Sequence, residues 1–560
     1  MCNCNFICKI VSVLILVVAF LVNTVSGWFG GGDIIPTKHC YLGHTCYETT
    51  LEETTEPSTE EHTTQPSTDE PGTVPSTEET TESTTESTTE STTESTTEST
   101  SPVEPSETTT TTKHTTTKPP ETDAGPHIMT AEQTSLAVFG GSADDIYRGI
   151  APMSDGGYVV CGTTDSKDGN LAKAYTNTSW KTPYSFIARY SKTGTLKWIK
   201  GFSSTSAGIT LEDVAVLSDG SIVAVGYTQA TDYAANNESK GTYEAIILKL
   251  NASNGYLKSK KSFGGKGADM FTCVTATDTG FAVGGTSYST TGDFADLPGT
   301  SAIIMNFDAN INIIWKKYLH GNAASTIGGI AYDNSGNLFA TCLTSSTTDD
   351  FSVFDNLTGG YTDTVVLKYD NTGAYQWGYV ISSTGRDEFA AVAPDGKGGC
   401  VVAGNFELVP SPIPDGTLKG IPHCGGIDAL VFRINANGTQ RWVKTLSGFK
   451  DDFITDIVRT DGGFAITGYS TSANREFAVT GNEGGYDGFV SFINTNGVTV
   501  NTISQAGSKN DVAECLTYTT DGEIVALGKT QSTDIDFAEL NTYSDAVYLG
   551  YMSRYTITVK

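Results

Sequence analysis

The stretch SDGGYVVCG, residues 154–162, joins an acidic, glycine-rich turn to a run of β-branched and aromatic residues. This order is typical of a β-hairpin, because Asp and Gly tolerate turn dihedrals while Val and Tyr favour strands. The chain repeats the phrase as LSDGSIVAVGYT from Leu217, RTDGGFAITGYS from Arg459 and TTDGEIVALGKT from Thr519. One supersecondary unit is therefore used several times.

The acids of these turns give the period, because seven of them recur 55 to 66 residues apart: Asp155, Asp219, Asp278, Asp333, Asp395, Asp461 and Asp521. Each unit predicts four strands, as in DIYRGIAPM, YVVCGTT, SFIARYS and LKWIKGF of the first unit. Seven such units exceed the roughly ten strands of an open twisted sheet. We therefore predict an all-β fold, a seven-bladed β-propeller of four-stranded antiparallel blades. A solenoid or a row of sandwiches is the alternative.

The two ends of the repeat region indicate how the ring closes. SLAVFGG, from Ser135, aligns with a fourth strand but precedes the first unit, whereas the last unit runs into RYTITVK without a glycine turn. We therefore predict that residues 134–139 pair beside residues 546–552. The alternative is that residues 555–560 supply the fourth strand themselves.

The motifs GGSADD, SDGGYVV and TGNEGGYDGFV, with a W-x-K phrase after a glycine turn, cover residues 135 to about 552. They resemble the tandem DGGY/GGSxxD repeats of secreted bacterial surface proteins. The resemblance implies a propeller repeat and no particular activity, because those proteins are mostly uncharacterised. Units four and five depart most from the pattern.

The N-terminal region predicts export. Residues 1–27 combine Lys9, the apolar run IVSVLILVVAFLV and small residues before Trp28, as a signal peptide does, although an uncleaved anchor is the alternative. Residues 28–48 form a short cysteine-containing segment, and residues 49–130 are rich in Thr, Ser, Glu and Pro. We expect the latter to be a disordered linker or a glycosylated stalk, followed by the propeller at residues 131–560. The expected location is extracellular, with no membrane contact after cleavage.

The charge of −30 excludes nucleic-acid binding on electrostatic grounds, because an acidic surface repels a phosphate backbone. Residues 28–130 hold 20 acids against 3 lysines, and residues 131–560 hold 44 acids against 30 bases. Each part is therefore acidic on its own, and the net charge of the whole chain conceals no basic part. The expected partner is an extracellular glycan or protein, bound by a monomer.

Cysteine and asparagine patterns suit an exported chain. Cys40 and Cys46 are close enough for a disulfide loop. The cysteines of the repeats predict buried thiols or an isolated bridge such as Cys400 to Cys424, because no paired CxxC spacing indicates zinc. Five sequons are candidates for glycosylation in BC loops or CD turns, where A to D denote the strands of a blade in chain order: Asn177, Asn237, Asn251, Asn356 and Asn437.

The BC loops and the connections between blades emerge at the same end of the ring, which makes that end the expected binding face. Six aspartates recur at the connections and are candidate calcium ligands, no other cofactor being expected: Asp145, Asp213, Asp269, Asp387, Asp452 and Asp511. The alternative is that each closes a local turn onto backbone N–H groups.

An acid, an aromatic and a small residue also recur in the BC loops. Exposed, the rings would form a platform for a ligand; buried, they would plug the blades. The candidate binding residues are Asp232, Tyr233, Asp293, Phe294, Asp350, Phe351, Phe477, Asp536 and Phe537, together with Trp180 in an irregular loop. The irregular loop from Leu408 to Cys424 is the other candidate for recognition.

Catalysis has little support in the sequence, since neither GxSxG nor HExxH occurs and the ring holds only scattered histidines. YDNTGAYQW resembles a docking phrase of quinoprotein propellers but also fits an ordinary CD hairpin, and SDGGYVV lacks the Trp of the sialidase motif. We therefore expect a non-catalytic module that binds a glycan or protein. A secreted propeller enzyme, a glycan hydrolase or lyase or a quinoprotein, is the alternative.

Overall fold

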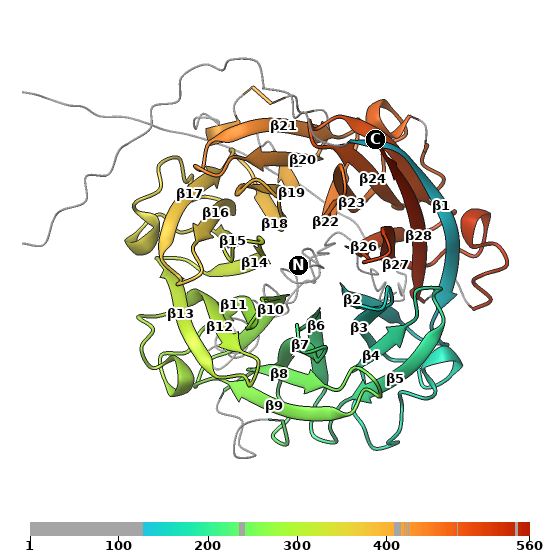
Figure 1. Ribbon diagram of the computed structural model, residues 1–560, viewed down its shortest axis with the longest axis horizontal. Coiled ribbons are helices and arrows are strands. Elements are labelled where there is room, and N and C mark those ends of the chain that lie inside the picture. The colour runs from blue at the N-terminus through green and yellow to red at the C-terminus, as the bar shows by residue number, and fades with distance from the viewer. Residues whose placement is uncertain are drawn as a thin grey trace, which may run out of the picture. The chain divides into compact units, whose positions relative to one another are not determined.

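A computed structural model of the chain describes residues 127–560 apart from 234–240, 408–415, 419, 422, 424, 479 and 544–546. The predicted signal peptide, the cysteine-containing segment and residues 49–126 of the predicted stalk lie outside the described residues. Within them, seven separate four-stranded antiparallel sheets stand around a central axis (Figure 1). The prediction of a seven-bladed propeller is confirmed.

The first two strands of each blade are its A and B strands, and the A strands lie nearest the centre of the ring (Figure 1). The A strands are β2 (Asp145–Pro152), β6 (Ile209–Val216), β10 (Asp269–Ala276), β14 (Ser325–Tyr332), β18 (Asp387–Pro394), β22 (Asp452–Thr460) and β26 (Asp511–Tyr518). The B strands are β3 (Tyr158–Thr164), β7 (Ile222–Thr228), β11 (Gly280–Ser287), β15 (Leu338–Thr344), β19 (Cys400–Glu407), β23 (Gly463–Ser470) and β27 (Glu523–Thr530).

The C and D strands complete each blade towards the outer wall. The C strands are β4 (Tyr184–Tyr190), β8 (Glu244–Leu250), β12 (Ser301–Asp308), β16 (Asp363–Tyr369), β20 (Ile427–Ile434), β24 (Asp487–Asn494) and β28 (Leu549–Val559). The D strands are β5 (Leu196–Phe202), β9 (Leu257–Phe263), β13 (Ile313–His320), β17 (Tyr375–Ile381), β21 (Gln440–Leu446), β25 (Thr499–Gln505) and β1 (Ile128–Phe139).

The hairpin at residues 154–162 behaves as its composition predicts. Gly156 adopts a φ of 81°, which only glycine reaches without strain, and the N–H of Met153 donates to the carbonyl of Gly157. The Asp155 carboxylate accepts a hydrogen bond from the Gly157 N–H at 3.2 Å and another from Arg189 at 2.5 Å. The recurring turn acid is thus a structural residue.

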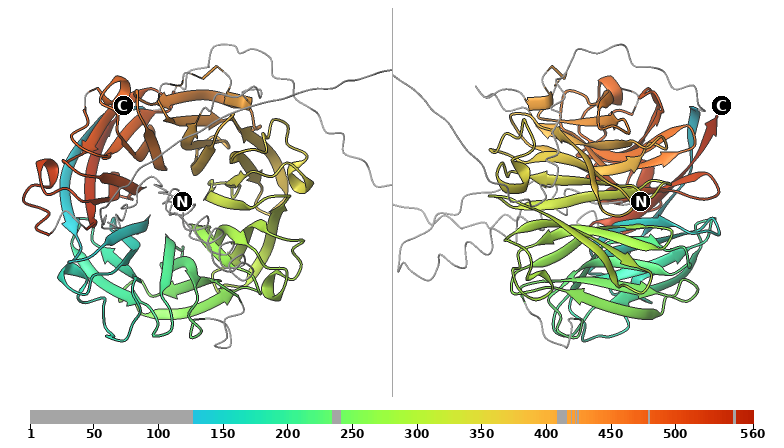
Figure 2. Two further views of the ribbon diagram at one scale, coloured as in Figure 1. Left: turned by 180° about the vertical axis from the view of Figure 1, so that it is seen from behind. Right: turned by 60° about the vertical axis from the view of Figure 1, so that its left-hand side comes forward.

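The last blade is built from both ends of the chain, as predicted. β1 pairs with β28 as the outermost strand, with Leu136 opposite Ser553 and Phe139 opposite Gly550 (Figure 2). The partner strand begins at Leu549, later than the predicted residue 546, and residues 555–559 continue it instead of forming a strand of their own. Because this long strand needs a partner along its length, the propeller begins at Ile128 and not at residue 131.

The hydrophobic core lies between the blades. Seven clusters of buried residues each join one blade to the next, and the cluster that contains Tyr147 and Tyr158 of blade 1 also contains Val525 and Leu527 of blade 7. The B strands β3 and β7 are buried along their whole length. Neighbouring blades therefore bury both faces of each sheet, and closing the ring completes the core.

Tryptophans on three of the D strands, β5, β17 and β21, hold their blades to the next blade. The indole N–H of Trp198 donates to the carbonyl of Ala252, in the CD turn of the next blade, at 2.8 Å. A Cβ on Gly255 in that turn would lie 2.6 Å from the indole ring, so the glycine lets the ring approach. Trp377 and Trp442 repeat the hydrogen bond to Ala436 and Thr495.

Among the described residues, no helix is both long enough and apolar enough to cross a bilayer.

Candidate functional site

The BC loops share a one-turn 3₁₀ helix whose third residue plugs the top of the blade. In the six such turns described, this residue is Leu171, Phe294, Phe351, Leu418, Phe477 or Phe537. The four phenylalanines are at most 2% exposed. This is the placement of a plug, so these candidate binding residues offer no ring to a ligand.

The acids beside the plugs hold the connections between blades. A carboxylate oxygen of Asp293 accepts a hydrogen bond from the Gly264 N–H at 2.9 Å. Asp350 and Asp536 accept the equivalent bonds from the main-chain N–H groups of His320 and Ala506. The repeated acid–aromatic pair thus fixes the loop that carries it.

Tyr233 and Trp180 are only partly buried. The Lys260 ammonium lies 4.3 Å from the centroid of the Tyr233 ring and donates to the carbonyl of Asp232. The Trp180 ring packs against Tyr175 and Tyr184, with centroids 6.3 and 6.1 Å away. Both rings rest on their own blade, so neither joins a second aromatic group on a neighbouring blade.

Five of the six candidate calcium ligands begin an A strand and are enclosed by hydroxyl and N–H donors. Asp145 accepts hydrogen bonds from Thr164, from Ser166 at 3.0 Å and from the Gly141 N–H at 2.7 Å. Asp269 and Asp452 have the same set of partners in their blades, and Asp511 is bonded to Thr530 and Ser532. Burial raises the pKa of Asp145 and of Asp511 to about 7.

Asp213 is not part of this set, because it is the fifth residue of β6 and lies inside the strand. Its carboxylate accepts hydrogen bonds from the N–H of Val214 and, across the joint to the next blade, from the N–H of Val274 at 2.9 Å. The Asp456 carboxylate accepts the equivalent hydrogen bond from the N–H of Leu516 in the next blade. The residue of β6 at the place of Asp145 is Ile209, so Asp213 was wrongly grouped with the aspartates that begin the A strands.

The structure does not bring the six aspartates together. In the described part of the chain, no three His, Cys, Asp or Glu side chains gather in a way that suits a metal ion. Five of the six instead lie at the starts of their own A strands, and Asp213 bonds across the joint to the next blade.

The candidate disulfide between Cys400 and Cys424 involves a residue that the structure does not describe. Cys400 is a free, fully buried thiol on β19, and Cys424 lies outside the described residues. The thiol is held inside the blade because the first position of this B strand faces the core. Cys40 and Cys46 also lie outside the described residues.

The sequons fall where the blades predict them. Asn177 and Asn356 are exposed in BC loops, Asn437 is exposed in a CD turn, and Asn251 is partly exposed in another. Asn237 lies outside the described residues.

YDNTGAYQW is an ordinary CD hairpin. Residues 369–377 end β16 and begin β17, and Gly373, at a φ of 81°, lies under the ring of Trp315 from the preceding blade. The phrase therefore serves the joint between blades 3 and 4.

An aromatic cluster that sequence reasoning missed lies at the inner edge of the BC-loop face, on blade 6. Phe453 and Tyr469 stack with centroids 4.6 Å apart, and Tyr486 meets both edge-on, at 6.3 and 5.1 Å. Phe453 and Tyr469 are 4% and 5% exposed, whereas Tyr486 is partly exposed. Phe453, Tyr469 and Tyr486 are called the rim cluster below.

The rim cluster continues onto blade 7. The carbonyl of Tyr486 accepts the main-chain N–H of Asp511 at 2.6 Å, which joins the two blades at this edge. Tyr548, also partly exposed, lies close enough for its charge to help raise the pKa of Tyr486, after burial and Asp451. The Lys529 ammonium lies 5.2 Å from the Tyr548 ring centroid and 2.9 Å from the Glu514 carboxylate.

Blade 5 places titratable groups at the same inner edge. Glu388 is the second residue of β18, and its side chain is partly exposed. Burial of the carboxyl group raises its pKa to about 7; Arg386 lowers this pKa and Glu407 raises it. His423, from the irregular loop, lies 2.8 Å from the buried Asp428 carboxylate and edge-on to Phe406. The inner edge of blades 5 to 7 thus holds both exposed rings and an acid suited to proton transfer at neutral pH.

No protein-family model matches the chain, and no curated protein matches its sequence. Solved structures resemble the fold only distantly. BamB from Moraxella catarrhalis is 12% identical and covers 76% of this chain and 100% of its own, with a TM-score of 0.35. The β-propeller domain of the Trilobed protease from Pyrococcus furiosus is 10% identical, covering 69% of this chain and 91% of its own, with a TM-score of 0.37. A mutant Trypanosoma rangeli sialidase displaying trans-sialidase activity is 10% identical, covering 76% and 59%, with a TM-score of 0.35.

Proposed function

We propose that this protein is a secreted or surface-attached binding module that holds a glycan at the inner rim of blades 6 and 7. The observation that carries the proposal is the partly exposed Tyr486 ring, oriented by Phe453 and Tyr469 and continued by Tyr548. Aromatic faces bury much area at little entropic cost and suit the apolar faces of sugar rings.

The asymmetry of the ring supports a specific site. In blades 1, 3, 4 and 5, the residue before the C strand is Pro183, Thr300, Thr362 or Gly426, and only blade 2 repeats a tyrosine, Tyr243. A residue needed for every joint would recur in every blade. Tyr486 and Tyr548 are therefore better explained by a ligand than by the fold.

The test is a glycan array with the full chain, followed by affinity measurements on Tyr486→Ala and Tyr548→Ala. We expect each variant to weaken binding at least tenfold and Tyr486→Phe to retain most of it. Tyr361→Ala is the matched control, because Tyr361 is 44% exposed on blade 4 of the same face. Equal losses in the control, or capture of a protein and no glycan, would overturn the proposal.

A secreted glycan hydrolase is the second candidate, favoured by Glu388. A carboxyl group with a pKa of about 7 beside a second acid and an arginine suits general acid catalysis. Glu388→Gln separates the two functions, because a hydrolase would lose release of reducing ends from the bound glycan. A binding module would keep its affinity and show no release with either form.

A further inference from the structure

Lysines gather on the D strands of three successive blades, at the outer wall of the ring. Strands β5, β9 and β13 contain no Asp, Glu or Arg. Their lysines, called the lysine band below, are Lys197, Lys200, Lys258, Lys260, Lys261, Lys316 and Lys317.

The lysine band is continuous from blade to blade. The Lys200 ammonium lies 4.6 Å from the centroid of the Tyr256 ring, at the entrance to β9. Lys261 of β9 donates to the carbonyl of Ile311, in the turn before β13, at 2.5 Å. The three strands follow one another along the outer wall (Figure 1), so their charges form one surface.

Few acids reach these lysines. Lys316 pairs with Asp296 at 2.5 Å, and Lys261 and Lys317 lie near Asp308 and Asp370. Other contacts are to uncharged groups: Lys258 donates to the Ser221 hydroxyl at 2.7 Å and Lys260 to a main-chain carbonyl. Among the residues that the structure describes, these seven lysines thus have three acids as recorded carboxylate neighbours, which leaves the described part of this wall positive on a chain whose net charge is −30.

Protection of sheet edges does not explain the lysine band. Lysine on an exposed edge strand discourages pairing with other chains, and every blade has such an edge. The D strands β17, β25 and β1 nevertheless contain no lysine, and Lys444 of β21 is paired with Glu476 at 2.5 Å. The concentration on blades 1 to 3 therefore requires another reason.

Large apolar side chains are exposed among the same lysines. Tyr256 is 65% exposed and Leu257 42%, at the start of β9. On β13, Ile313 and Ile314 are 50% and 55% exposed and Tyr318 is 39% exposed. Exposed rings between positive charges offer both stacking and ionic contacts to one ligand.

We propose that the lysine band binds a linear polysaccharide carrying sulfate or carboxylate groups, at a surface separate from the inner rim. The band lies on a convex wall, which a flexible single chain can follow. A DNA duplex, with a persistence length of about 50 nm, cannot follow that wall.

The test measures binding of heparin and of polygalacturonate to the full chain at 50 mM and 200 mM salt. The variant Lys197→Gln/Lys258→Gln/Lys260→Gln removes three exposed charges, and Lys173→Gln/Lys397→Gln/Lys450→Gln removes three exposed charges elsewhere. We expect the first variant to weaken binding of at least one polysaccharide tenfold or more, the second less than twofold, and higher salt to weaken binding by the parent chain.

Three outcomes would overturn the proposal: binding of neither polysaccharide, equal weakening by both variants, or equally tight binding of duplex DNA or phosphatidylserine vesicles. Melting temperatures of both variants verify that the fold is intact. Tyr486→Ala should leave heparin binding unchanged, because Tyr486 lies at the inner rim, so failure of this proposal and failure of the rim proposal are distinguishable.

Discussion

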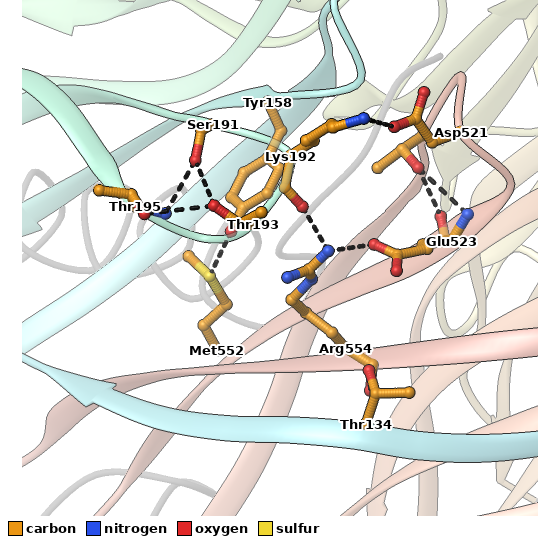
Figure 3. A network of polar contacts seen from close by, with 11 residues as sticks. Thr134, Tyr158, Ser191, Lys192, Thr193, Thr195, Asp521, Glu523, Met552 and Arg554 are labelled. Atoms are coloured by element: carbon orange, nitrogen blue, oxygen red, sulfur yellow. Dashed lines mark hydrogen bonds and ion pairs between the residues drawn. The ribbon is translucent and has the colours of Figure 1, made fainter.

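The guanidinium of Arg554, on β28 of the last blade, donates a hydrogen bond to the main-chain carbonyl of Lys192, in the CD turn of the first blade (Figure 3). It also contacts the Glu523 carboxylate. Arg189 makes the equivalent bond one joint further on, to Ala252 at 2.8 Å, where the same carbonyl also accepts the Trp198 indole N–H. Ser135 stands opposite Arg554 where Trp198 stands opposite Arg189, so the closing joint lacks the tryptophan and depends on the arginine.

Arg554→Ala should therefore weaken ring closure. Loss of a charged hydrogen bond at this partly buried joint should lower the free energy of unfolding by about 1.5–3 kcal/mol. Arg189→Ala is the matched control and should cost less, because Trp198 still holds that joint. Chemical denaturation measures both, and equal losses would contradict the argument.

Removing residues 128–139 should destabilise the whole ring. Without β1, the long strand β28 becomes an exposed edge, and apolar residues of the core between blades 7 and 1 lose Phe139. We expect a lower melting temperature and aggregation on heating, measured by calorimetry and light scattering. An unchanged melt would show that the N-terminal strand does not close the ring.

Ile535→Gly should stabilise the protein. Ile535 begins a one-turn helix of blade 7 with a φ of 51°, a conformation that β-branched residues avoid, and its side chain is 52% exposed. Gly292 occupies the same place in blade 3 at a φ of 65°. Relief of the strain should raise the free energy of unfolding by about 1 kcal/mol. Val353→Gly is the control and should give no such gain, because Val353 is exposed but does not have a positive φ.

Mild acidification should stabilise the propeller. Burial raises the pKa of Asp145, Asp511 and Glu388 to about 7 and that of Asp363 and Asp452 to about 6, well above the values of unfolded carboxyls. The folded state thus binds protons that the unfolded state releases, so stability rises as pH falls from about 7 towards 4 and is lost as pH rises through the folded pKa values.

Melting temperatures from pH 5 to pH 8 test this dependence. Asp145→Asn should flatten the curve, because one titrating carboxyl is removed. A melting temperature that rises steadily with pH over this range would show that the buried carboxyls remain ionised in the folded protein.

Local sequence was sufficient for the number of blades and for the closing strand. Turn residues and the pattern of strand residues are signals of a few residues, so a hairpin such as residues 154–162 can be recognised in the sequence at each repeat. Ser135 was recognised as part of a fourth strand for the same reason. Turn acids such as Asp155 bond the N–H groups of their own hairpin, which is a short-range contact of the same kind.

Local sequence could not decide whether Phe294 was a platform or a plug, because burial depends on what the neighbouring strands and loops leave uncovered. It misplaced Asp213, since a carboxylate that bonds Val274 of the next blade has no local signature. Each error concerns a contact made by side chains far apart in sequence.

The sequence by itself determined seven repeats of four strands, because their signals are short-range and repeated. Only the tertiary structure decided which surfaces those repeats create. Lys200, Lys261 and Lys317 are about sixty residues apart, and the acidic net charge of the chain gives no sign of them. They nevertheless stand at equivalent positions of adjacent D strands. Tyr486 and Tyr548 likewise precede the C strands of adjacent blades. The ring places equivalent residues of successive repeats side by side. Charged and aromatic side chains then act together on one surface, although they are far apart in the sequence.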